Sequence, residues 1–397
     1  MAKFQAGVGA NFDFLFEEEW QQVFEPMAQL SVSATQATYE DSLGNQVAML
    51  GNGLGNASGT VTRVTITDAD GDMIWDVTDL SINYTELHEA VQADWDYGIS
   101  DFMGELMRGD DVFTGTSGNE ELLVDADLGN DIVKGLGGDD FFRAGPGNNK
   151  MNGGAGWDIL AYHHTGWPEA QPTRGVVLDV EAGTAVNPWG GSDVIRNFET
   201  YWLSKFDDIV KNANADNGYF LLLEGDDRLD GRGGFTQLDY GREALYGATN
   251  GISLDLSKKT AIDGFGDIDT LRSIERVLGT EFDDTIAGDK RSNTIIAREG
   301  NDVLTGNGGK DVFEFYELVG VPFGHDQITD FGTGKREGRD RIDLSYIAGV
   351  ETFDDVLEIA EDTDEGVLIS FDVDNSITLV GVSIDDLTAG NFYITSF

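Results

Sequence analysis

The chain has 397 residues, and its 25 lysines and arginines against 73 aspartates and glutamates give a formal net charge of −48. This charge argues against nucleic acid and anionic membranes as partners, since both require basic surface, and the folded chain should repel itself unless cations are bound. Glycine is frequent at 52 residues, yet 40% of residues are hydrophobic, which favours a folded, periodic structure over a disordered acidic tail.

Residues 1–110 are expected to form a small β-rich N-terminal domain. Residues 60–82, TVTRVTITDADGDMIWDVTDLSI, alternate apolar and polar residues around an Asp-Gly turn, which predicts a β-hairpin. The turn resembles a truncated EF-hand loop but lacks the glutamate at position twelve, so a plain turn is favoured. Residues 84–107 have the mixed spacing of one or two short helices. No cleavable secretory signal is recognisable at the N-terminus.

A nine-residue repeat follows, with a carboxylate or carboxamide side chain at every ninth position. Its first block carries Asp131, Asp140, Asn149 and Asp158. The same register returns further along the chain, at Asp284, Asn293, Asp302 and Asp311. A weaker block between them has Asp208 and Asn217 in register, followed by Asp226 or Asp227. Three blocks with one period indicate a stacked repeat architecture.

A longer repeat contains the second and third blocks. Residues from 174 match those from 250 at an offset of 76 residues, pairing for example Glu199 with Glu275 and Asp208 with Asp284. After Phe315 the register stops, and two strand-like segments predict a cap for the open end. We therefore divide the chain into an N-terminal domain (1–110), a first repeat block (111–165), a duplicated module with a degenerate block (166–240), its second copy with a regular block (241–315), and a C-terminal cap (316–397).

The period has a physical explanation in a flat coil. Six residues rich in Gly, Asn and Asp favour a turn and the next three form a short strand, so eighteen residues complete one coil. Asp131 should then lie over Asn149, and Asp140 over Asp158. The apolar residues two places after each should point inward, namely Val133, Phe142, Met151 and Leu160. Stacked carboxylates require a cation between them, and ligands that are all oxygen suit Ca²⁺.

Residues 153–160, GGAGWDIL, resemble the RTX (repeats-in-toxin) nonapeptide up to its apolar position. The resemblance extends from about residue 115 to the C-terminus, and the C-terminal part resembles the β-roll region that follows serralysin-type proteases. It implies an all-β fold of right-handed parallel β-roll blocks that bind several Ca²⁺ ions. The ending NFYITSF resembles the signals of type I secretion, which implies a secreted or cell-surface bacterial protein exported by that machinery.

The resemblance also implies ligands, with two carbonyls and one side chain from each of two turns eighteen residues apart. In the first block the two sites would use Asp127, Gly129, Asp131, Ala144, Pro146 and Asn149, and Leu136, Gly138, Asp140, Gly153, Ala155 and Asp158. In the last block they would use Thr280, Phe282, Asp284, Ala297, Glu299 and Asp302, and Asp289, Arg291, Asn293, Gly306, Gly308 and Asp311. In the middle block, where the register slips, the candidates are Asp208, Asn217 and Asp227.

Three departures from the repeat predict weaker sites. Asn149 and Asn293 are neutral where the repeat has an aspartate, and Arg291 stands in place of a glycine. The two asparagines therefore lack the negative charge that attracts a cation.

Motifs for catalysis are lacking in the sequence. It has no cysteine, no His-Glu-x-x-His helix and no G-x-S-x-G elbow. The adjacent His163 and His164 would point to opposite faces of a strand, which disfavours a shared metal. The aromatic residues around the first block are expected in a core or cap, with a sugar-binding face as the alternative; they are Trp157, Trp167, Trp189, Tyr201 and Trp202.

The leading hypothesis is a secreted, non-enzymatic RTX protein that folds on binding extracellular Ca²⁺ and has a surface, matrix or interaction role. The alternatives are an extracellular carbohydrate-active enzyme, either a polysaccharide lyase or a hydrolase, and an adhesin or surface-layer subunit. Extracellular polysaccharide and self-association are the candidate partners besides the secretion machinery. No membrane insertion is expected, since the longest apolar runs, such as residues 220–223, are far too short to span a bilayer.

Overall fold

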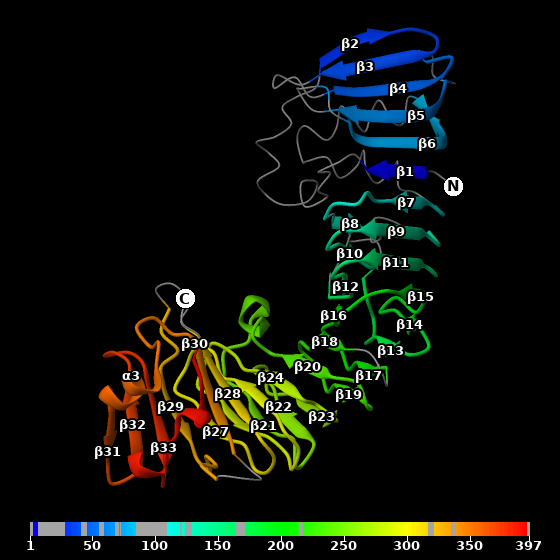
Figure 1. The fold of residues 1–397 in the computed structure, drawn as a ribbon. Helices are drawn as coiled ribbons and strands as arrows, with labels where there is room; N and C mark the ends of the chain where they lie inside the picture. The colour runs from blue at the N-terminus through cyan, green and yellow to red at the C-terminus, as the bar shows by residue number, and fades with distance from the viewer. Residues whose placement is uncertain are drawn as a thin grey trace. The chain divides into compact units, whose positions relative to one another are not determined.

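The computed structural model describes residues 3–6, 28–40, 46–54, 59–67, 71, 73–84, 109–119, 121–123, 129–163, 171–213, 217–316, 321–334 and 339–394. The chain divides into two compact units, Met1–Trp202 and Leu203–Phe397, which are considered separately (Figure 1). Asp127, Trp167, His164 and nearly all of the segment expected to hold helices after Tyr84 lie outside the described residues. In the parts of the chain that are described, no helix has the length and apolarity needed to cross a membrane.

In the described residues of the first unit the named elements are all strands. They are β1 (Lys3–Ala6), β2 (Ala28–Val32), β3 (Gln36–Glu40), β4 (Gln46–Asn52), β5 (Thr60–Thr67), β6 (Met73–Asn83), β7 (Val112–Thr114), β8 (Glu121–Leu123), β9 (Ile132–Gly137), β10 (Phe141–Arg143), β11 (Lys150–Ala155), β12 (Ile159–Ala161), β13 (Val177–Asp179), β14 (Thr184–Val186), β15 (Ser192–Arg196) and β16 (Thr200–Trp202).

The N-terminal strands form an antiparallel sheet that leads into the repeat region. β2 to β6 pair in sequence order, and the predicted hairpin over residues 60–82 is confirmed as β5 and β6. Val64 and Ile66 of β5 are buried, as the alternating pattern requires. β1 pairs antiparallel with β6 and parallel with β7, so its backbone joins the N-terminal sheet to the first repeat strand.

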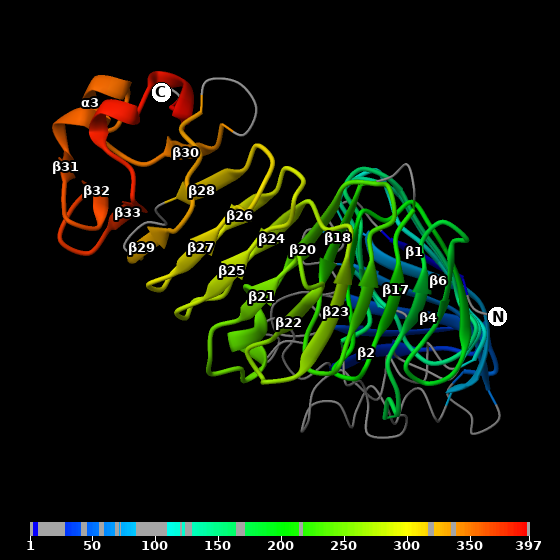
Figure 2. The same cartoon turned by 90° about the horizontal axis from the view of Figure 1, so that it is seen from below.

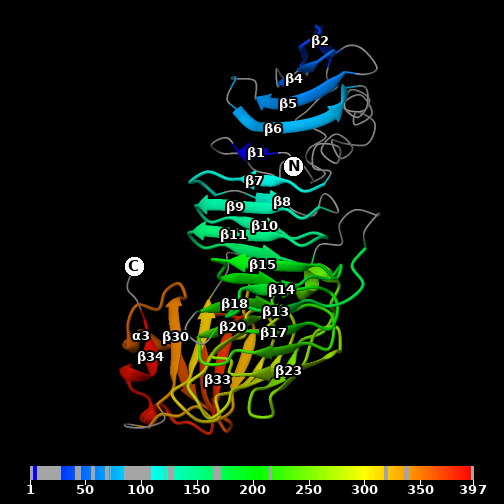
Figure 3. The same cartoon turned by 90° about the vertical axis from the view of Figure 1, so that its right-hand side faces the viewer.

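The repeat region of the first unit is a parallel β-roll with two sheets. β7, β9, β11 and β15 follow one another in one sheet, and β8, β10, β12 and β16 in the other (Figure 3). Lys150 of β11 pairs with Ile132 of β9, so one coil takes the eighteen residues that the period predicts. The predicted inward-facing residues are all buried between the sheets, and these are Val133, Phe142, Met151 and Leu160.

In the second unit, one α-helix and three short 3₁₀ segments accompany the strands among the residues that are described. The strands are β17 (Ile209–Lys211), β18 (Gly218–Leu221), β19 (Arg228–Asp230), β20 (Thr236–Asp239), β21 (Ser253–Asp255), β22 (Thr260–Ile262), β23 (Ile268–Arg272), β24 (Arg276–Leu278), β25 (Thr285–Ala287), β26 (Thr294–Ile296), β27 (Val303–Thr305), β28 (Val312–Tyr316), β29 (His325–Ile328), β30 (Arg341–Tyr346), β31 (Ala360–Asp362), β32 (Gly366–Ser370), β33 (Ser376–Val380) and β34 (Phe392–Tyr393). The helical segments are η3 (Glu243–Tyr246), α3 (Phe353–Glu358), η4 (Ile384–Asp386) and η5 (Ala389–Asn391).

These strands form a second parallel β-roll. One sheet runs from β18 through β20, β24, β26, β28 and β30 to β34. On the other face, β21, β25, β27, β29 and β33 pair in turn, and Figure 2 shows these two rows of strands in the second unit. Beyond residue 315 the predicted cap strands are present as β29, β30, β32 and β33, and α3 accompanies them. That helix was not predicted; its N-cap Thr352 forms a capping box with Asp355.

The two stretches related by the 76-residue offset have the same strand arrangement. In the first copy β13, β14 and β15 form an antiparallel meander in which Val177 faces Val186. In the second copy β21, β22 and β23 form the same meander, with Ser253 facing Ile262. In each copy the meander is inserted between successive coils of the roll, which breaks the eighteen-residue spacing without breaking the parallel stack.

Candidate metal centres

The turn residues of successive coils are linked by a repeated hydrogen bond. The backbone N–H of Asp140 donates to Oδ1 of Asp158, 18 residues later, at 2.9 Å. The N–H of Asp131 donates in the same way to Oδ1 of Asn149 at 2.9 Å. We call such a donor and acceptor pair a rung. The predicted stacking of turn residues is thereby confirmed, and each rung uses only one oxygen of the accepting side chain.

The second oxygen of several rung carboxylates is buried without a hydrogen-bond partner. This holds for Oδ2 of Asp158, Asp302 and Asp326, whose residues are at most 1% exposed. Burial, followed by the charge of its neighbours, raises the pKa of Asp302 to about 9, and burial raises that of Asp326 to about 8. For Asp158 burial raises the pKa to about 6. A buried carboxylate without a partner needs either a proton or a cation, because desolvation penalises the bare charge.

Glycines surround these carboxylates where a side chain would collide with candidate ligands. A Cβ placed on Gly135 would lie 2.0 Å from Asp140 Oδ2 and 2.4 Å from the carbonyl oxygen of Gly153. A Cβ on Gly279 would likewise lie 2.2 Å from Asp284 Oδ2 and 2.7 Å from the carbonyl oxygen of Ala297. Each glycine therefore marks a small space where a carboxylate meets a carbonyl from the turn 18 residues later.

The same convergence occurs at Gly288, where a Cβ would lie 2.7 Å from both Asn293 Oδ1 and the carbonyl oxygen of Gly306. Three side chain and carbonyl pairs that the RTX resemblance implies are thus brought together: Asp140 with Gly153, Asp284 with Ala297, and Asn293 with Gly306.

Side chains alone do not complete a site. Within the described ranges, no group of three or more acidic or histidine side chains is arranged to hold a metal ion. Backbone carbonyl oxygens must supply the remaining ligands, as they do for the hard cation Ca²⁺ in flexible oxygen sites. The buried carboxylates and the glycine-lined spaces beside carbonyls fit such an ion.

Some rungs are instead satisfied by the protein's own nitrogen atoms. Asn149 Nδ2 donates to the carbonyl oxygens of Gly145 and Pro146, both at 3.2 Å. Asn293 Nδ2 donates to the carbonyl oxygen of Ile274 at 3.0 Å. The two asparagines that depart from the repeat thus direct N–H groups at carbonyls, which reduces the need for a cation there.

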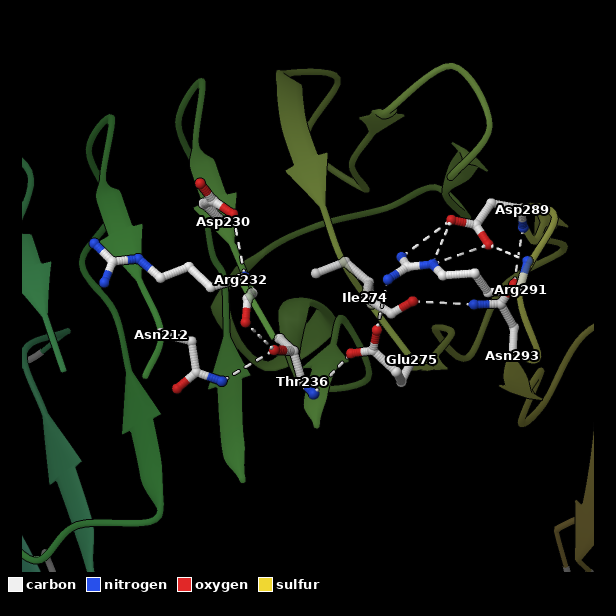
Figure 4. Close-up of polar contacts among 10 residues, drawn as sticks. Asn212, Asp230, Arg232, Thr236, Ile274, Glu275, Asp289, Arg291 and Asn293 are labelled. Atoms are coloured by element: carbon white, nitrogen blue, oxygen red, sulfur yellow. Dashed lines mark hydrogen bonds and ion pairs between the residues drawn. The ribbon is translucent and has the colours of Figure 1, made fainter. Parts of the chain in front are cut away.

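Arg291 supplies a positive charge from the protein itself. Its guanidinium forms ion pairs with Glu275 and Asp289, each at 3.0 Å, and Figure 4 shows it between those two carboxylates with Asn293 beside them. In the same view, Thr236 takes the turn position of an aspartate: its hydroxyl accepts a hydrogen bond from Asn212 Nδ2, and its N–H donates to Glu275. Glu275 and Asp289 are thus each paired with the Arg291 guanidinium.

The middle block keeps the stack but not the eighteen-residue count. The N–H of Asp208 donates to Oδ1 of Asp227, 19 residues later, so Asp227 rather than Asp226 is the stacked residue. Asp208 itself accepts hydrogen bonds from the N–H and the hydroxyl of Ser204. Asn217 is exposed.

The other predicted ligands lie in or beside the turns. Leu136 has the left-handed backbone of a turn residue, with φ 79°, as does Gly138, with φ 105°. The Ala155 carbonyl accepts the Gly138 N–H, and the Asp289 carbonyl accepts the Gly308 N–H. Asp131, Ala144, Asp311 and Thr280 are buried, and the Thr280 hydroxyl donates to Asp284. The remaining residues line the same turns: Gly129, Phe282 and Glu299.

Six rung acceptors were missed from the sequence because an insertion precedes each of them. Asn149 donates to Asp193 across 44 residues, and Asp158 to Glu199 across 41. Beyond the last block, Asp302 donates to Asp326 across 24 residues and Asp311 to Asp340 across 29. Asp227 donates to Asp269 across 42. Two of these acceptors could have been found from the sequence, because Glu199 and Glu275 match at the 76-residue offset. Both accept a rung hydrogen bond.

The described aromatic residues mostly pack within the first unit. Tyr201 is buried, and Trp202 lies edge-on to Phe141 with ring centroids 5.0 Å apart. Trp157 is half-exposed, and its indole N–H donates to Thr200 Oγ1 at 2.8 Å. His163 lies 5.3 Å from the Trp202 ring, between ring centroids.

Comparison with known proteins identifies the repeats. The family model for the RTX calcium-binding nonapeptide repeat (4 copies) matches residues 124–160 and 278–313. No curated protein matches the chain. Among solved structures, the extracellular lipase LipA from Serratia marcescens is similar at 17% sequence identity and a TM-score of 0.23. The match covers 72% of this chain and 40% of the lipase. Both compact units of the chain therefore contain RTX calcium-binding nonapeptide repeats.

Proposed function

We propose that this protein is secreted unfolded and that extracellular Ca²⁺ folds its two β-rolls by binding between successive turns. The single observation that carries the proposal is the set of buried carboxylate oxygens without partners at Asp158, Asp302 and Asp326. A cation there neutralises the stacked charge and accepts the remaining lone pairs, and the nearby carbonyls complete its coordination.

The net charge of −48 supports coupling between binding and folding. Without cations the roll would bring many carboxylates together in a low-dielectric interior, which opposes folding. Extracellular calcium modules bind at about 10⁻⁴ to 10⁻³ M, so the sites would stay empty at cytosolic calcium concentrations. Each ion that binds only the folded state then adds its own stabilisation.

The experiment is a calcium titration of the full chain followed by far-ultraviolet circular dichroism. We expect chelator to reduce the β signal strongly, and millimolar Ca²⁺ but not equimolar Mg²⁺ to restore it, since Mg²⁺ demands stricter octahedral geometry. A β spectrum that is the same in chelator and in Ca²⁺ would show that the rolls fold without the ion.

The broader role that we propose is non-enzymatic, at a surface, in a matrix or in an interaction, with export by type I secretion machinery. The carbohydrate-active enzyme receives little support from the aromatic residues, because Tyr201 and Trp202 are engaged in packing. Self-association or polysaccharide binding after calcium-induced folding would be tested by sedimentation of the folded protein with and without polysaccharide.

A further inference from the structure

Each unit contains a rung at the equivalent position of its repeat, and the side chains around the two rungs differ in chemistry. In the first unit the N–H of Asn149 donates to Oδ1 of Asp193 at 2.9 Å, and Tyr162 donates its hydroxyl to Oδ2 of that aspartate. In the second unit the N–H of Asp227 donates to Oδ1 of Asp269 at 3.0 Å, and Tyr240 donates its hydroxyl to Oδ2. The strands that follow pair in the same way, β11 with β15 and β19 with β23.

In the first unit, side-chain amides fill the space at this rung. Asn187 Nδ2 lies 2.9 Å from the carbonyl oxygen of Gly147, 3.4 Å from that of Gly145, and 3.2 Å from each carboxylate oxygen of Asp193. Asn149 Nδ2 approaches the Gly145 carbonyl from the other turn. The positively polarised NH₂ group of Asn187 thus occupies a point where four oxygens converge.

In the second unit, carboxylates replace both amides. Asp263 corresponds to Asn187 at the module offset of 76 residues, and its loop is closed in the same way: the Asp263 N–H donates to the Asp267 carbonyl as the Asn187 N–H donates to that of Gly191. Asp227 corresponds to Asn149 through the equivalent rung. The chain thus exchanges two neutral donors for two negative acceptors at one position of the fold.

These carboxylates are buried and incompletely paired. Asp263 Oδ1 accepts three backbone N–H groups, those of residues 265, 266 and 267, whereas its Oδ2 has no partner. Asp227 Oδ2 also has none. Both residues are 1% exposed.

Glu243 adds a third carboxylate close to Asp263. It is fully buried, its Oε2 accepts the N–H of Gly264, and its Oε1 is unpartnered. Through that hydrogen bond Glu243 places a further buried carboxyl group beside the Asp263 loop.

We propose that Asp227 and Asp263 bind a divalent cation, Ca²⁺ by the all-oxygen chemistry of the donors, with Glu243 as the neighbouring balancing charge. The site lies outside the segments matched as nonapeptide repeats, and the carbonyls of Leu223 and Gly225 correspond in sequence to those of Gly145 and Gly147. The inference rests on the proposed function and extends it: the second unit needs an ion at a rung that the first unit satisfies with its own amides.

The test counts bound calcium in the full chain by equilibrium dialysis with ⁴⁵Ca²⁺. The variant Asp227→Asn with Asp263→Asn installs the residues of the first unit and should bind one ion fewer than the wild type. The reciprocal variant, Asn149→Asp with Asn187→Asp, should bind one ion more. Circular dichroism in Ca²⁺ should show the wild-type β content for both.

The outcomes separate the two proposals. A wild-type protein that binds no calcium would overturn the proposed function. A wild type that binds calcium together with two variants that bind the same number would overturn only the site at Asp227 and Asp263. Loss of β content in the Asp227→Asn, Asp263→Asn variant in Ca²⁺ would also contradict the site, because amides at this rung would then fail to replace the ion.

Discussion

The backbone N–H of Asp302 donates to Oδ1 of Asp326 at 2.8 Å, while Oδ2 of both carboxylates is buried without a hydrogen-bond partner. The hydrogen bond fixes the spacing of the two turns, and the free oxygens define what a ligand must supply. Two carboxylates held this close disfavour each other's ionisation, so proton and cation compete for the same atoms.

This competition predicts different pH dependences of stability with and without calcium. Burial raises the pKa of Asp302 to about 9 and that of Asp326 to about 8, from an ordinary value of 3.8. The folded state therefore binds protons more tightly than the unfolded state, and these groups contribute stability that is present at acidic pH and lost as the pH rises toward about 9. Bound Ca²⁺ requires the ionised carboxylates, so its stabilisation should increase over the same range.

Urea unfolding between about pH 5 and about pH 8.5, in chelator and in Ca²⁺, measures both slopes. The free energy of unfolding should fall with pH in chelator and stay nearly constant in saturating calcium, where these carboxylates are ionised in both the folded and the unfolded state, so the difference between the two media should grow with pH. Parallel slopes in the two media would contradict competition between proton and cation at these carboxylates.

Asp302→Asn should weaken the calcium requirement of the second unit. The neutral amide removes a buried carboxyl group that must take up a proton when no cation is bound, which should stabilise the calcium-free fold by about 1–3 kcal/mol, a typical cost of an unsatisfied buried group. The same change removes a ligand, so the calcium bound per chain should fall. Asp364→Asn, at an exposed position of the same unit, is the matched control and should change neither quantity. Equal effects of the two substitutions would indicate a general charge effect rather than a site.

Gly135→Ala should disrupt the first block, because its Cβ would lie 2.0 Å from Asp140 Oδ2 and 2.4 Å from the Gly153 carbonyl oxygen. We expect a loss of about 1–3 kcal/mol from overpacking and a loss of calcium at that turn. Gly137→Ala, two residues later in β9, is the control, since its nearest contact would be an ordinary 3.5 Å. Calcium-dependent melting curves of the two variants give the comparison, and similar curves would mean that the space at Gly135 holds nothing essential.

The sequence predicted the repeating part of the fold well because the pattern and the packing have the same period. Val133 and Met151 are eighteen residues apart, both are buried, and they pair in adjacent strands. It predicted the rungs only while that period lasted. Asp193 and Asp326 accept the same kind of hydrogen bond. The inserted meander before Asp193 and the longer loop before Asp326 have lengths that the nine-residue repeat does not predict. The role of Asn187 depends on where its loop closes, which spacing does not encode.

Arg291→Gly combined with Asn293→Asp should create a calcium site where the second unit now uses its own cation. Arg291 forms ion pairs with Glu275 and Asp289, and Asn293 Oδ1 lies near the Gly306 carbonyl beside Gly288. Removing the guanidinium leaves Glu275 and Asp289 without their positively charged partner, and the new aspartate adds a negative charge at the ligand position. One further Ca²⁺ should therefore bind. Because the ion pairs are partly exposed, their loss alone should cost only about 0–1 kcal/mol. Calcium counting on the single and double variants tests this: the double variant should gain an ion that Arg291→Gly alone does not. If the count stays at the wild-type value in the double variant, Arg291 and Asn293 are not what keeps calcium out of this turn.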